Sequence, residues 1–331
     1  MQQYSANDIP KTNYSKYLGI ILILILVFMI APRSNESALV AGANAEKNTS
    51  DSLPKELDQV ENFIELLPGS KPPLIYSKQY LLLDGKTAEV IVAKDPDLPI
   101  PIASTTKMTT ALIAINKLPV SKIVTISQKP PNIQGSKIGL RAGEKTTVEN
   151  LLRGLLIYSG NDAAFALAEA YADSSGEYRQ FVQAMNDFAL ENHLVNTRYG
   201  DPAGLDDETG RSTSRELANV ARLLLQNPLL AEIVATPETT ISSVDGQIVH
   251  RLINTNRLIQ TDSTYYLPNA IGIKTGFTLD AGHSLVAAYR WQNRILIGVV
   301  MNTIESTNTA SAVEMNKLFR WADNSLVLTN Y

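Results

Sequence analysis

Hydrophobic positions along the chain follow two different spacings. Apolar side chains three and four positions apart, typical of helices, cover residues 147–172, 176–193 and 212–228. Short apolar runs bounded by turn residues predict strands at 79–84, 87–94, 270–278, 283–291 and 294–302. Gly85-Lys86 separates the first two runs, and Gln292-Asn293 separates the last two, so each pair reads as a hairpin.

Further helices are expected at 101–115 and at 310–326, and the section from about 119 to 267 reads as mostly helical. Ser212 or Ser214 is the expected N-cap of the helix at 212–228. Strands at both ends of the region, with helices between them, predict an α+β fold. We expect one antiparallel sheet built from both ends of the domain, with a helical lobe inserted.

The N-terminal segment has the order of an export signal. Residues 1–16 are polar and expected to stay cytoplasmic, with Lys11 and Lys16, and an uncharged apolar run of 15 residues, Tyr17–Ala31, follows. That length suits the hydrophobic part of a signal peptide and is short of the roughly 20 residues of a spanning helix. Small-residue cleavage patterns occur only at 41–45, so we favour a retained signal anchor over a cleaved signal. The protein is then extracytoplasmic, held at the cell membrane, or secreted if cleavage occurs.

Residues 32–73 are rich in Asn, Ser, Pro and Ala and read as a linker, with a short helix over 54–67. The globular domain is expected to run from 74 to 331. The chain ends soon after the last expected helix, so no further C-terminal domain or anchor is expected, and membrane attachment would fall to the N-terminal segment.

Composition narrows the classes of function. The chain has 331 residues, is 44% hydrophobic and 19% charged, and has a net charge of -4. It shows no basic stripe, so nucleic acid is not an expected partner. There is no cysteine, which excludes disulfides and thiolate metal sites. No two of the three histidines, His193, His250 and His283, have metal-ligand spacing, so neither a metal nor another cofactor is expected.

Ser104 and Lys107 are the first candidates for chemistry. They lie three residues apart at the start of an otherwise apolar helix, so both side chains are expected on one face. A serine hydroxyl becomes a strong nucleophile only when a base takes its proton, and a buried lysine can be that base. Free backbone N–H groups at a helix start would also stabilise negative charge on an attacked carbonyl oxygen.

S-x-x-K alone is common by chance. Two further motifs strengthen the case that Ser104 and Lys107 are catalytic. Ser159-Gly160-Asn161 lies 55 residues after Ser104, and Lys274-Thr275-Gly276 lies 170 residues after it. S-x-x-K, S-x-N and K-T-G occur in this order in β-lactamases and penicillin-binding proteins. From Ser77 to Asn302 the chain resembles the serine-type D-alanyl-D-alanine carboxypeptidases, the low-molecular-mass penicillin-binding proteins. The stretches 185–207, 212–218 ("STSRELA") and 254–258 ("NTNRL") resemble the same family.

The resemblance implies a β-lactamase/transpeptidase-like fold and a serine acyl-enzyme mechanism. The implied substrates are peptidoglycan stem peptides ending in D-Ala-D-Ala, and β-lactams are implied as covalent inhibitors. Ser104 would attack the carbonyl carbon and Lys107 would take its proton. Ser159 would relay that proton to the leaving amine, and Asn161 would hold the peptide amide.

The third motif carries the implied substrate-binding residues. Lys274 would supply positive charge near Ser159 and toward the terminal carboxylate, to which Thr275 would hydrogen-bond. Gly276 would let the strand lie against substrate. The backbone N–H groups of Ser104 and Phe277 would form the oxyanion hole.

Departures from the family pattern leave alternatives open. Residues 303–317 lack an arginine that many relatives have there for carboxylate recognition, although Arg290 and Arg294 are near in sequence. A class A-like β-lactamase would need a glutamate that activates water. Glu191 and Asn196 suggest such a pair, but we expect Glu191 to be a solvated helix residue. A non-catalytic cell-wall binding protein is the other alternative, and the intact motifs argue against it.

Overall fold

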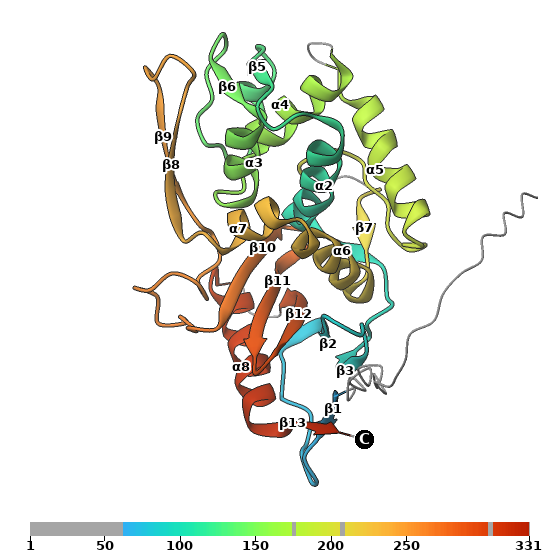
Figure 1. The fold of residues 1–331 in the computed structure, drawn as a ribbon. Coiled ribbons are helices and arrows are strands. Elements are labelled where there is room, and N and C mark those ends of the chain that lie inside the picture. Colours follow the sequence, from blue (N-terminus) through green and yellow to red (C-terminus); the bar gives the residue numbers. More distant parts are fainter. Residues whose placement is uncertain (1–61, 174–176, 206–208, 304–306, 331) are drawn as a thin grey trace, which may run out of the picture. The chain divides into compact units, whose positions relative to one another are not determined.

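A five-stranded antiparallel sheet underlies the helices of this molecule (Figure 1). The computed structural model describes residues 62–173, 177–205, 209–303 and 307–330. The sheet order is β10-β11-β12-β2-β3, and the strands are β10 (Ala270–Thr278), β11 (Gly282–Trp291), β12 (Arg294–Thr303), β2 (Ser77–Asp84) and β3 (Val90–Lys94). Strands from the two ends of the domain meet where β12 pairs with β2. The predicted sheet is therefore confirmed.

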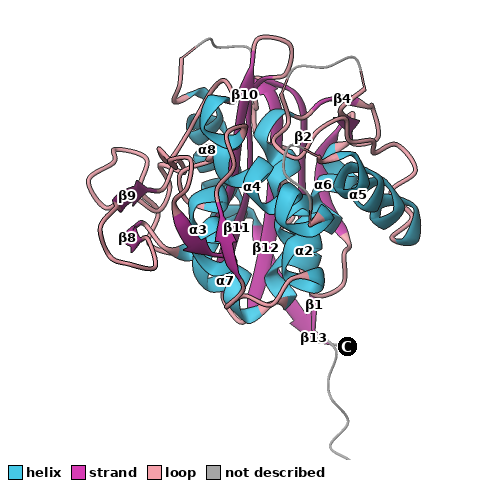
Figure 2. Ribbon diagram, turned by 90° about the horizontal axis from the view of Figure 1, so that it is seen from above, coloured by secondary structure: helices cyan, strands magenta, loops and turns pink. Residues whose placement is uncertain are grey.

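Helices cover both faces of the sheet (Figure 2). On one face lies the inserted lobe, whose helices are α2 (Lys107–Lys117), α3 (Val148–Leu156), α4 (Asn161–Ala172), α5 (Arg179–Glu191), α6 (Ser214–Gln226) and α7 (Pro228–Ala235). On the other face, α8 (Ala310–Ser325) packs against β11 and β12. This α+β arrangement is the one that the alternation of strand and helix patterns predicts.

The residues of β12 show how one strand serves two cores. Ile297, Val299 and Met301 belong to the core that includes the helical lobe. The intervening Leu296 and Val300 belong to the core beneath α8. Because successive side chains of a strand point to opposite faces, a continuous apolar run indicates burial on both. Gly298 lets α8 approach, since a Cβ there would lie 2.5 Å from the sulfur of Met315.

The helix predicted at 212–228 is α6, and a separate helix, α7, begins directly after it at Pro228. The N-cap of α6 is Thr213, whose side chain accepts a hydrogen bond from Glu216 N at 3.1 Å, so the expectation of Ser212 or Ser214 is wrong. Asn227 caps α7 by accepting from two backbone N–H groups, and Pro228 follows at the first helical position, where its missing N–H costs nothing.

Short strand pairs interrupt the section that the sequence predicts as mostly helical. The pairs are β5 (Ile123–Thr125) with β6 (Lys145–Thr147), β8 (Glu238–Ser242) with β9 (Val249–Ile253), and β4 (Ile100–Pro101) with β7 (Arg211–Ser212). In β9, His250 and Leu252 are buried and alternate with exposed residues. Segments of two to five residues are too short for hydrophobic periodicity to separate strand from loop.

The N-terminal strand of the described chain corrects two expectations. β1 (Asn62–Leu66) pairs antiparallel with β13 (Leu326–Asn330). The short helix expected over 54–67 is therefore wrong within its described part, and the folded region begins before residue 74. Local spacing of Phe63, Ile64 and Leu66 fits either element, and pairing with the distant C-terminal strand decides between them.

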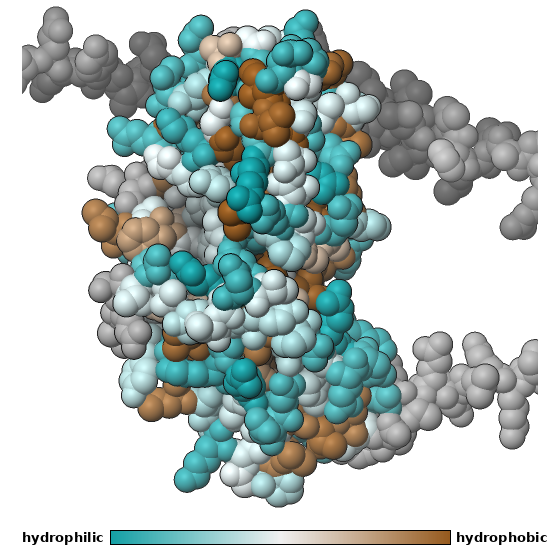
Figure 3. Space-filling model, turned by 90° about the vertical axis from the view of Figure 1, so that its left-hand side faces the viewer, coloured by the Kyte–Doolittle hydropathy of each residue, from teal (hydrophilic) through white to brown (hydrophobic). Residues whose placement is uncertain are grey.

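Within the described ranges, no helix is both long and apolar enough to cross a bilayer. The apolar run Tyr17–Ala31 lies outside the described residues. On the face shown in Figure 3, hydrophilic residues are spread over the described surface, and hydrophobic residues form separated groups.

Arg294, at the start of β12, provides a test of the packing at one end of the sheet. Its Nη1 donates to Asp84 Oδ2 at 2.9 Å, the two side chains are 5% and 3% exposed, and its Nη2 donates to the carbonyl of Asn62. Arg294→Met should lower the free energy of unfolding in urea by about 3–5 kcal/mol, because it leaves a buried carboxylate without its cation. Arg290→Met, at an exposed position of β11, should change it by less than about 0.5 kcal/mol. Equal stabilities of the two variants would contradict this assignment.

Candidate active site

Ser104 lies on a tight turn that the fold clamps from two sides. The 3₁₀ helix η2 (Ala103–Thr106) joins β4 to α2, and Ala103 has a left-handed φ of 48°. Below it, a Cβ on Gly276 of β10 would lie 3.3 Å from Ser104 N and 3.1 Å from Ile102 O. On the other side, a Cβ on Gly204 would lie 1.9 Å from Ala103 O. Gly204 is therefore required by the packing of the serine turn, and Gly276 allows the turn a tight contact with β10. The approach of substrate expected at Gly276 stays a prediction.

Lys107 is the first residue of α2, and its side chain is fully buried. Its Nζ lies 2.8 Å from Ser104 Oγ, 2.7 Å from Asn161 Oδ1 and 2.7 Å from the carbonyl oxygen of Ala203. A neutral amine has two N–H donors and one lone pair. The amide and carbonyl oxygens can only accept, so they take the two donors. The lone pair is then left for the hydroxyl of Ser104, as a base requires.

Burial lowers the pKa of Lys107 to about 7, although the carboxylates of Asp201 and Asp162 act in the opposite direction. The cost of desolvating an ammonium group exceeds the attraction of the two acids. An amine with this pKa exchanges a proton readily near neutral pH. The structure therefore gives the serine a base at the distance of a hydrogen bond.

The two acids also hold loops in place, a role that the sequence did not indicate. Asp201 accepts hydrogen bonds from the backbone N–H groups of Ala203, Gly204 and Leu205. Its own pKa is raised by burial, against the effect of those hydrogen bonds and of Lys107. This turn presents the Ala203 carbonyl to Lys107. Residues 185–207 were recognised as a familial stretch, but no residue in it received a role.

Asp162 does the same for the loop before β6. It accepts from the backbone N–H groups of Ile138, Gly139 and Leu140 at 3.0–3.1 Å. Because Asp162 is the second residue of α4, next to Asn161, this contact holds the loop against the S-x-N motif. The loop carries Ser136, which lines the cleft described below and which the sequence did not single out.

Ser159 and Asn161 lie where α3 gives way to α4. Ser159 is in the left-handed region, with φ 68°, which is uncommon for a residue with a side chain and occurs often at functional sites. Asn161 Oδ1 accepts from Lys107, and its Nδ2 donates to Gln134 O at 2.7 Å. Asn161 thus positions the lysine, and its expected hold on the peptide amide stays a prediction.

Lys274 and Thr275 lie in the middle of β10, beside an irregularity in its pairing with β11 between Ile271 and Ile273. Lys274 is 1% exposed, and its Nζ donates to the Thr275 carbonyl at 2.9 Å. Burial, and then the nearness of Lys107, hold the pKa of Lys274 well below its usual range. The Thr275 hydroxyl shares a 2.6 Å hydrogen bond with that of Thr255.

An open cleft of roughly 590 Å³ brings the three motifs together. Of the residues singled out in the sequence, Ser104, Ser159, Thr275, Gly276 and Phe277 line it. Lys107, Asn161 and Lys274 are buried and are not part of its lining. The cleft also contains residues that sequence reasoning did not assign, among them Thr255 and Arg257 of the familial stretch 254–258, and Asn308 and Ser311.

Other sequence candidates lie elsewhere or at the rim. His283 lines the cleft and stacks on Phe277, with ring centroids 4.2 Å apart. His250 is buried and bonds Glu144 at 2.8 Å, which makes it structural. Arg290 and Arg294 do not line the cleft, nor does Glu191, which is exposed at the end of α5. Glu191 is therefore not placed to activate a water molecule in the cleft.

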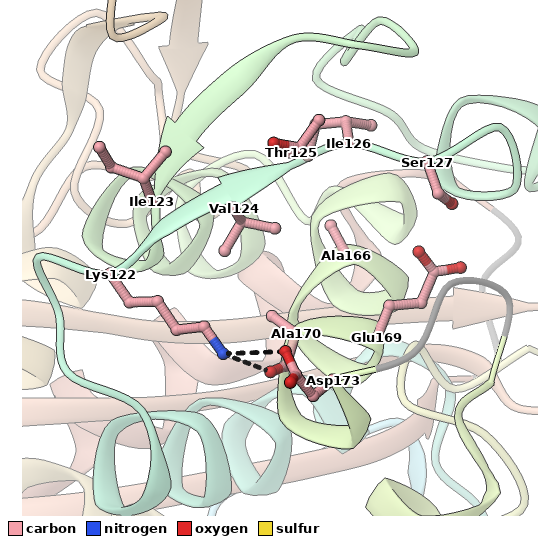
Figure 4. Close-up of a pocket in the computed structure, with 10 residues that line it drawn as sticks. All are labelled: Lys122, Ile123, Val124, Thr125, Ile126, Ser127, Ala166, Glu169, Ala170 and Asp173. Carbon is pink, nitrogen blue, oxygen red and sulfur yellow. Dashed lines mark hydrogen bonds and ion pairs between the residues drawn. The ribbon is translucent and has the colours of Figure 1, made fainter.

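A second cavity, of about 190 Å³, lies between β5 and α4 and shares no residue with the cleft (Figure 4). Lys122 spans it, donating to the Ala170 carbonyl at 2.9 Å and pairing with Asp173 at 3.8 Å. This contact ties β5 to the end of α4. None of the three motifs contributes to this cavity.

Comparison with known proteins identifies the family. The sequence profile of the D-alanyl-D-alanine carboxypeptidases, peptidase family S11, matches residues 68–305. The chain belongs to this family. It is 32% identical to D-alanyl-D-alanine carboxypeptidase DacF of Bacillus subtilis over 74% of the chain, and 33% identical to DacA of Haemophilus influenzae over 76%. The matched regions span 62% and 63% of the length of those relatives.

Solved structures of similar proteins have the same fold. A D-alanyl-D-alanine carboxypeptidase from Mycobacterium tuberculosis superposes with a TM-score of 0.69 at 28% identity, covering 78% of this chain and 97% of that one. The Streptomyces K15 DD-transpeptidase gives 0.69 at 28% identity, covering 76% and 98%. The penicillin-binding, transpeptidase-like fold of this S11 family member is therefore established, as the sequence predicted.

The depressed pKa of Lys107 can be measured directly. In protein labelled with ¹³C at lysine Cε, one resonance should titrate near pH 7 and should be missing in Lys107→Met. An unfolded lysine has a pKa of about 10.4, so between pH 7 and 10 the unfolded chain binds more protons than the folded one. The free energy of unfolding should therefore rise with pH in this window relative to Lys107→Met. If the variant loses no resonance titrating near pH 7, the amine is not the base described here.

Proposed function

We propose that this chain is a serine D-alanyl-D-alanine carboxypeptidase that removes the terminal D-alanine from peptidoglycan stem peptides through an acyl-enzyme. The observation that carries the proposal is the 2.8 Å contact between Ser104 Oγ and the buried amine of Lys107. Membership of the S11 family supports the choice of substrate, since the relatives bear this activity in their names.

Acylation begins with attack of Ser104 Oγ on the carbonyl carbon of the penultimate D-alanine. The hydroxyl proton passes to the lone pair of Lys107 as the new C–O bond forms. Collapse of the tetrahedral intermediate breaks the C–N bond, and the leaving amine of the terminal D-alanine takes up a proton. Ser159, which lines the same cleft, is the proposed relay: Lys107 gives its proton to Ser159 Oγ as the Ser159 hydroxyl proton passes to the amine, so Lys107 is neutral again before deacylation.

The oxyanion of this intermediate needs donors that are already in place. The proposed donors are the backbone N–H groups of Ser104 and Phe277. The packing of η2 directly on β10 at Gly276 supports this pairing, because it brings the serine turn against the strand that contains Phe277. The start of α2, close by, adds the favourable end of a helix dipole.

Deacylation uses water as the acceptor. Water attacks the ester carbonyl, Lys107 accepts its proton, and the proton is returned to Ser104 Oγ as the C–O bond breaks. Glu191 lies outside the cleft. It therefore cannot activate the attacking water in the way that the glutamate of a β-lactamase does. A β-lactam, which mimics the D-Ala-D-Ala end, should therefore acylate Ser104 and leave slowly.

The cell location is part of the proposal. A substrate in the cell wall requires an extracytoplasmic enzyme, and the apolar run Tyr17–Ala31 supports export with retention at the membrane. The proposed attachment is therefore this N-terminal segment.

Labelling by penicillin tests the nucleophile and its base together. Penicillin should add its mass to the intact protein, on the peptide that contains Ser104, and the adduct should persist for minutes or longer. Ser104→Ala should abolish labelling and Lys107→Ala should nearly abolish it. The double variant should be scarcely worse than Ser104→Ala, because the two residues act as a unit. Mass spectrometry gives the site, and circular dichroism controls for folding.

Particular outcomes separate the alternatives. Release of the adduct within seconds, with the hydrolysed drug as product, would identify a β-lactamase. A folded protein that is never labelled and does not cleave a D-Ala-D-Ala peptide would be a non-catalytic binding protein. Labelling at a residue other than Ser104 would overturn the mechanism.

Membrane attachment has its own test. Membranes from cells expressing the full chain should keep the protein after a high-salt wash, because the apolar run Tyr17–Ala31 is uncharged. A variant with residues 17–31 deleted serves as the control and should not be retained. N-terminal sequencing that finds a mature protein beginning near Glu46, free in the medium, would contradict the proposal.

A further inference from the structure

A buried histidine outside the cleft contacts a loop that reaches into it. His250 lies in β9, is buried and does not line the cleft. Its Nδ1 lies 3.1 Å from the carbonyl oxygen of Ile138, and its Nε2 lies 2.8 Å from Glu144 Oε1. Ile138 and Glu144 belong to residues 133–144, the segment before β6, which we call the Ser136 loop. The imidazole therefore ties β9 to the Ser136 loop.

The two contacts of His250 are separate hydrogen bonds. The carbonyl oxygen of Ile138 can only accept, so Nδ1 carries the proton of the first bond. Nε2 and Glu144 Oε1 share the proton of the second. The side chain of Glu144 is fully buried, and its Oε2 accepts from Arg141 N at 2.9 Å. A substitution can therefore remove one bond of the imidazole and keep the other.

The Ser136 loop packs directly on the S-x-N motif. A Cβ on Gly160 would lie 3.0 Å from Ile138 Cγ2. Asn161 is bonded to the loop twice, through its Nδ2 to the carbonyl of Gln134 and through its backbone N–H to the carbonyl of Ser136, both at 2.7 Å. The position of the loop therefore determines the position of Asn161.

Asn161 transmits this position to the base. Its Oδ1 accepts from Lys107 Nζ at 2.7 Å, and the backbone of Gly135 covers its amide, since a Cβ there would lie 2.6 Å from Asn161 Nδ2. Burial is the largest cause that lowers the pKa of Lys107 to about 7. Movement of the loop away from Asn161 would admit water toward the amine. The pKa of Lys107 would then rise toward its usual value of about 10.4.

Asp162 and His250 hold the loop from two sides. Asp162 of α4 accepts from the backbone N–H groups of Ile138 and of the two residues after it, whereas His250 of β9 donates to the Ile138 carbonyl. Without the second bond this carbonyl has lost its donor, and the loop gains hydrogen bonding by turning the carbonyl toward water. The bond from His250 therefore opposes the movement that would expose Asn161.

We propose that His250 is a positioning residue for acylation, because its bond to the Ile138 carbonyl holds the Ser136 loop over Asn161. The loop in turn keeps Lys107 enclosed. His250 acts through these groups and does not line the cleft, so it is not a catalytic residue. The inference rests on the proposed function, in which Lys107 is the base for Ser104.

The titration of Lys107 reports on the loop. Asp162 of α4, Asp201 in the segment after α5 and Lys274 of β10 are the charged groups of the described chain that act on Lys107. Glu144 is the acid that His250 contacts. Substitution of His250 removes none of the three groups that act on Lys107. A change in its titration therefore reports on its enclosure.

Two substitutions separate the two bonds of His250. An asparagine places its amide nitrogen at the δ position, like Nδ1, and a glutamine places it at the ε position, like Nε2. His250→Asn therefore keeps a donor for the Ile138 carbonyl, and His250→Gln keeps one for Glu144. His193→Asn, at an exposed histidine after α5, is the matched control.

Activity and stability should change in different variants. In His250→Gln the pH profile for acylation by a fluorescent penicillin should move up by about one pH unit, which lowers the rate at pH 7 by about fivefold and restores it near pH 10. The ¹³C resonance of Lys107 should move in the same direction. His250→Asn should keep the wild-type profile, yet unfold at a lower urea concentration than His250→Gln, because it leaves Glu144 without its partner. His193→Asn should match the wild type in every measurement.

The outcomes decide the inference separately from the proposed function. A wild-type profile in His250→Gln, or a loss of rate that is equal at every pH, would overturn the inference. If the wild type is not acylated and cleaves no D-Ala-D-Ala peptide, the proposed function fails, and the Lys107 resonance decides alone. A titration at higher pH in His250→Gln that returns to the wild-type position in His250→Asn supports the role of His250, and an unmoved resonance overturns it. If circular dichroism shows His250→Asn unfolded, the comparison of His250→Gln with the wild type decides by the same criteria.

Discussion

The rest of the site depends on the burial of one amine. The Lys107 side chain is fully buried, and its Nζ contacts the Ser104 hydroxyl, the Asn161 amide oxygen and the Ala203 carbonyl. Burial favours the neutral form of the amine. The amide and carbonyl oxygens take its two N–H donors, so its lone pair is left for the Ser104 hydroxyl. Three separate segments must therefore meet at the lysine before it can act as a base. Asp162 and Asp201 organise two of them through backbone hydrogen bonds.

The sheet supports this cluster by allowing the serine turn to approach β10 closely. Gly276 of β10 leaves room for the serine turn, and Gly204 leaves room on the opposite side. A methyl group at either position would meet backbone atoms, which cannot move as the end of a flexible side chain can. The helical lobe and α8 cover the two faces of the sheet, so β10 is held as a firm base for the turn.

The two lysines and the arginine of the site differ in how deeply they are buried. Lys107 and Lys274 are both buried, burial lowers the pKa of each amine, and the nearness of Lys107 lowers that of Lys274 further. Arg257 lines the cleft, and its guanidinium stays charged there.

The amino-acid sequence by itself predicted the motifs, their order and the architecture. The five main strands and the long helices have strong periodicity, and Ser104, Ser159 and Lys274 occur in patterns recognisable without coordinates. Sequence reasoning was wrong or silent where an element depends on a distant partner. β1 is a strand because β13 pairs with it, and the short pairs of the lobe carry too little local pattern.

Only the tertiary structure decided which groups surround the amine and which charge faces the cleft. The Ala203 carbonyl lies 96 residues from Lys107, and a backbone atom leaves no trace in the sequence of side chains. The bond from Lys107 to Asn161 likewise joins residues 54 positions apart, and Arg257 was noted in the sequence only as part of a familial stretch. Whether a lysine is buried or an arginine lines a cleft is a property of packing between distant segments, and local sequence does not contain it.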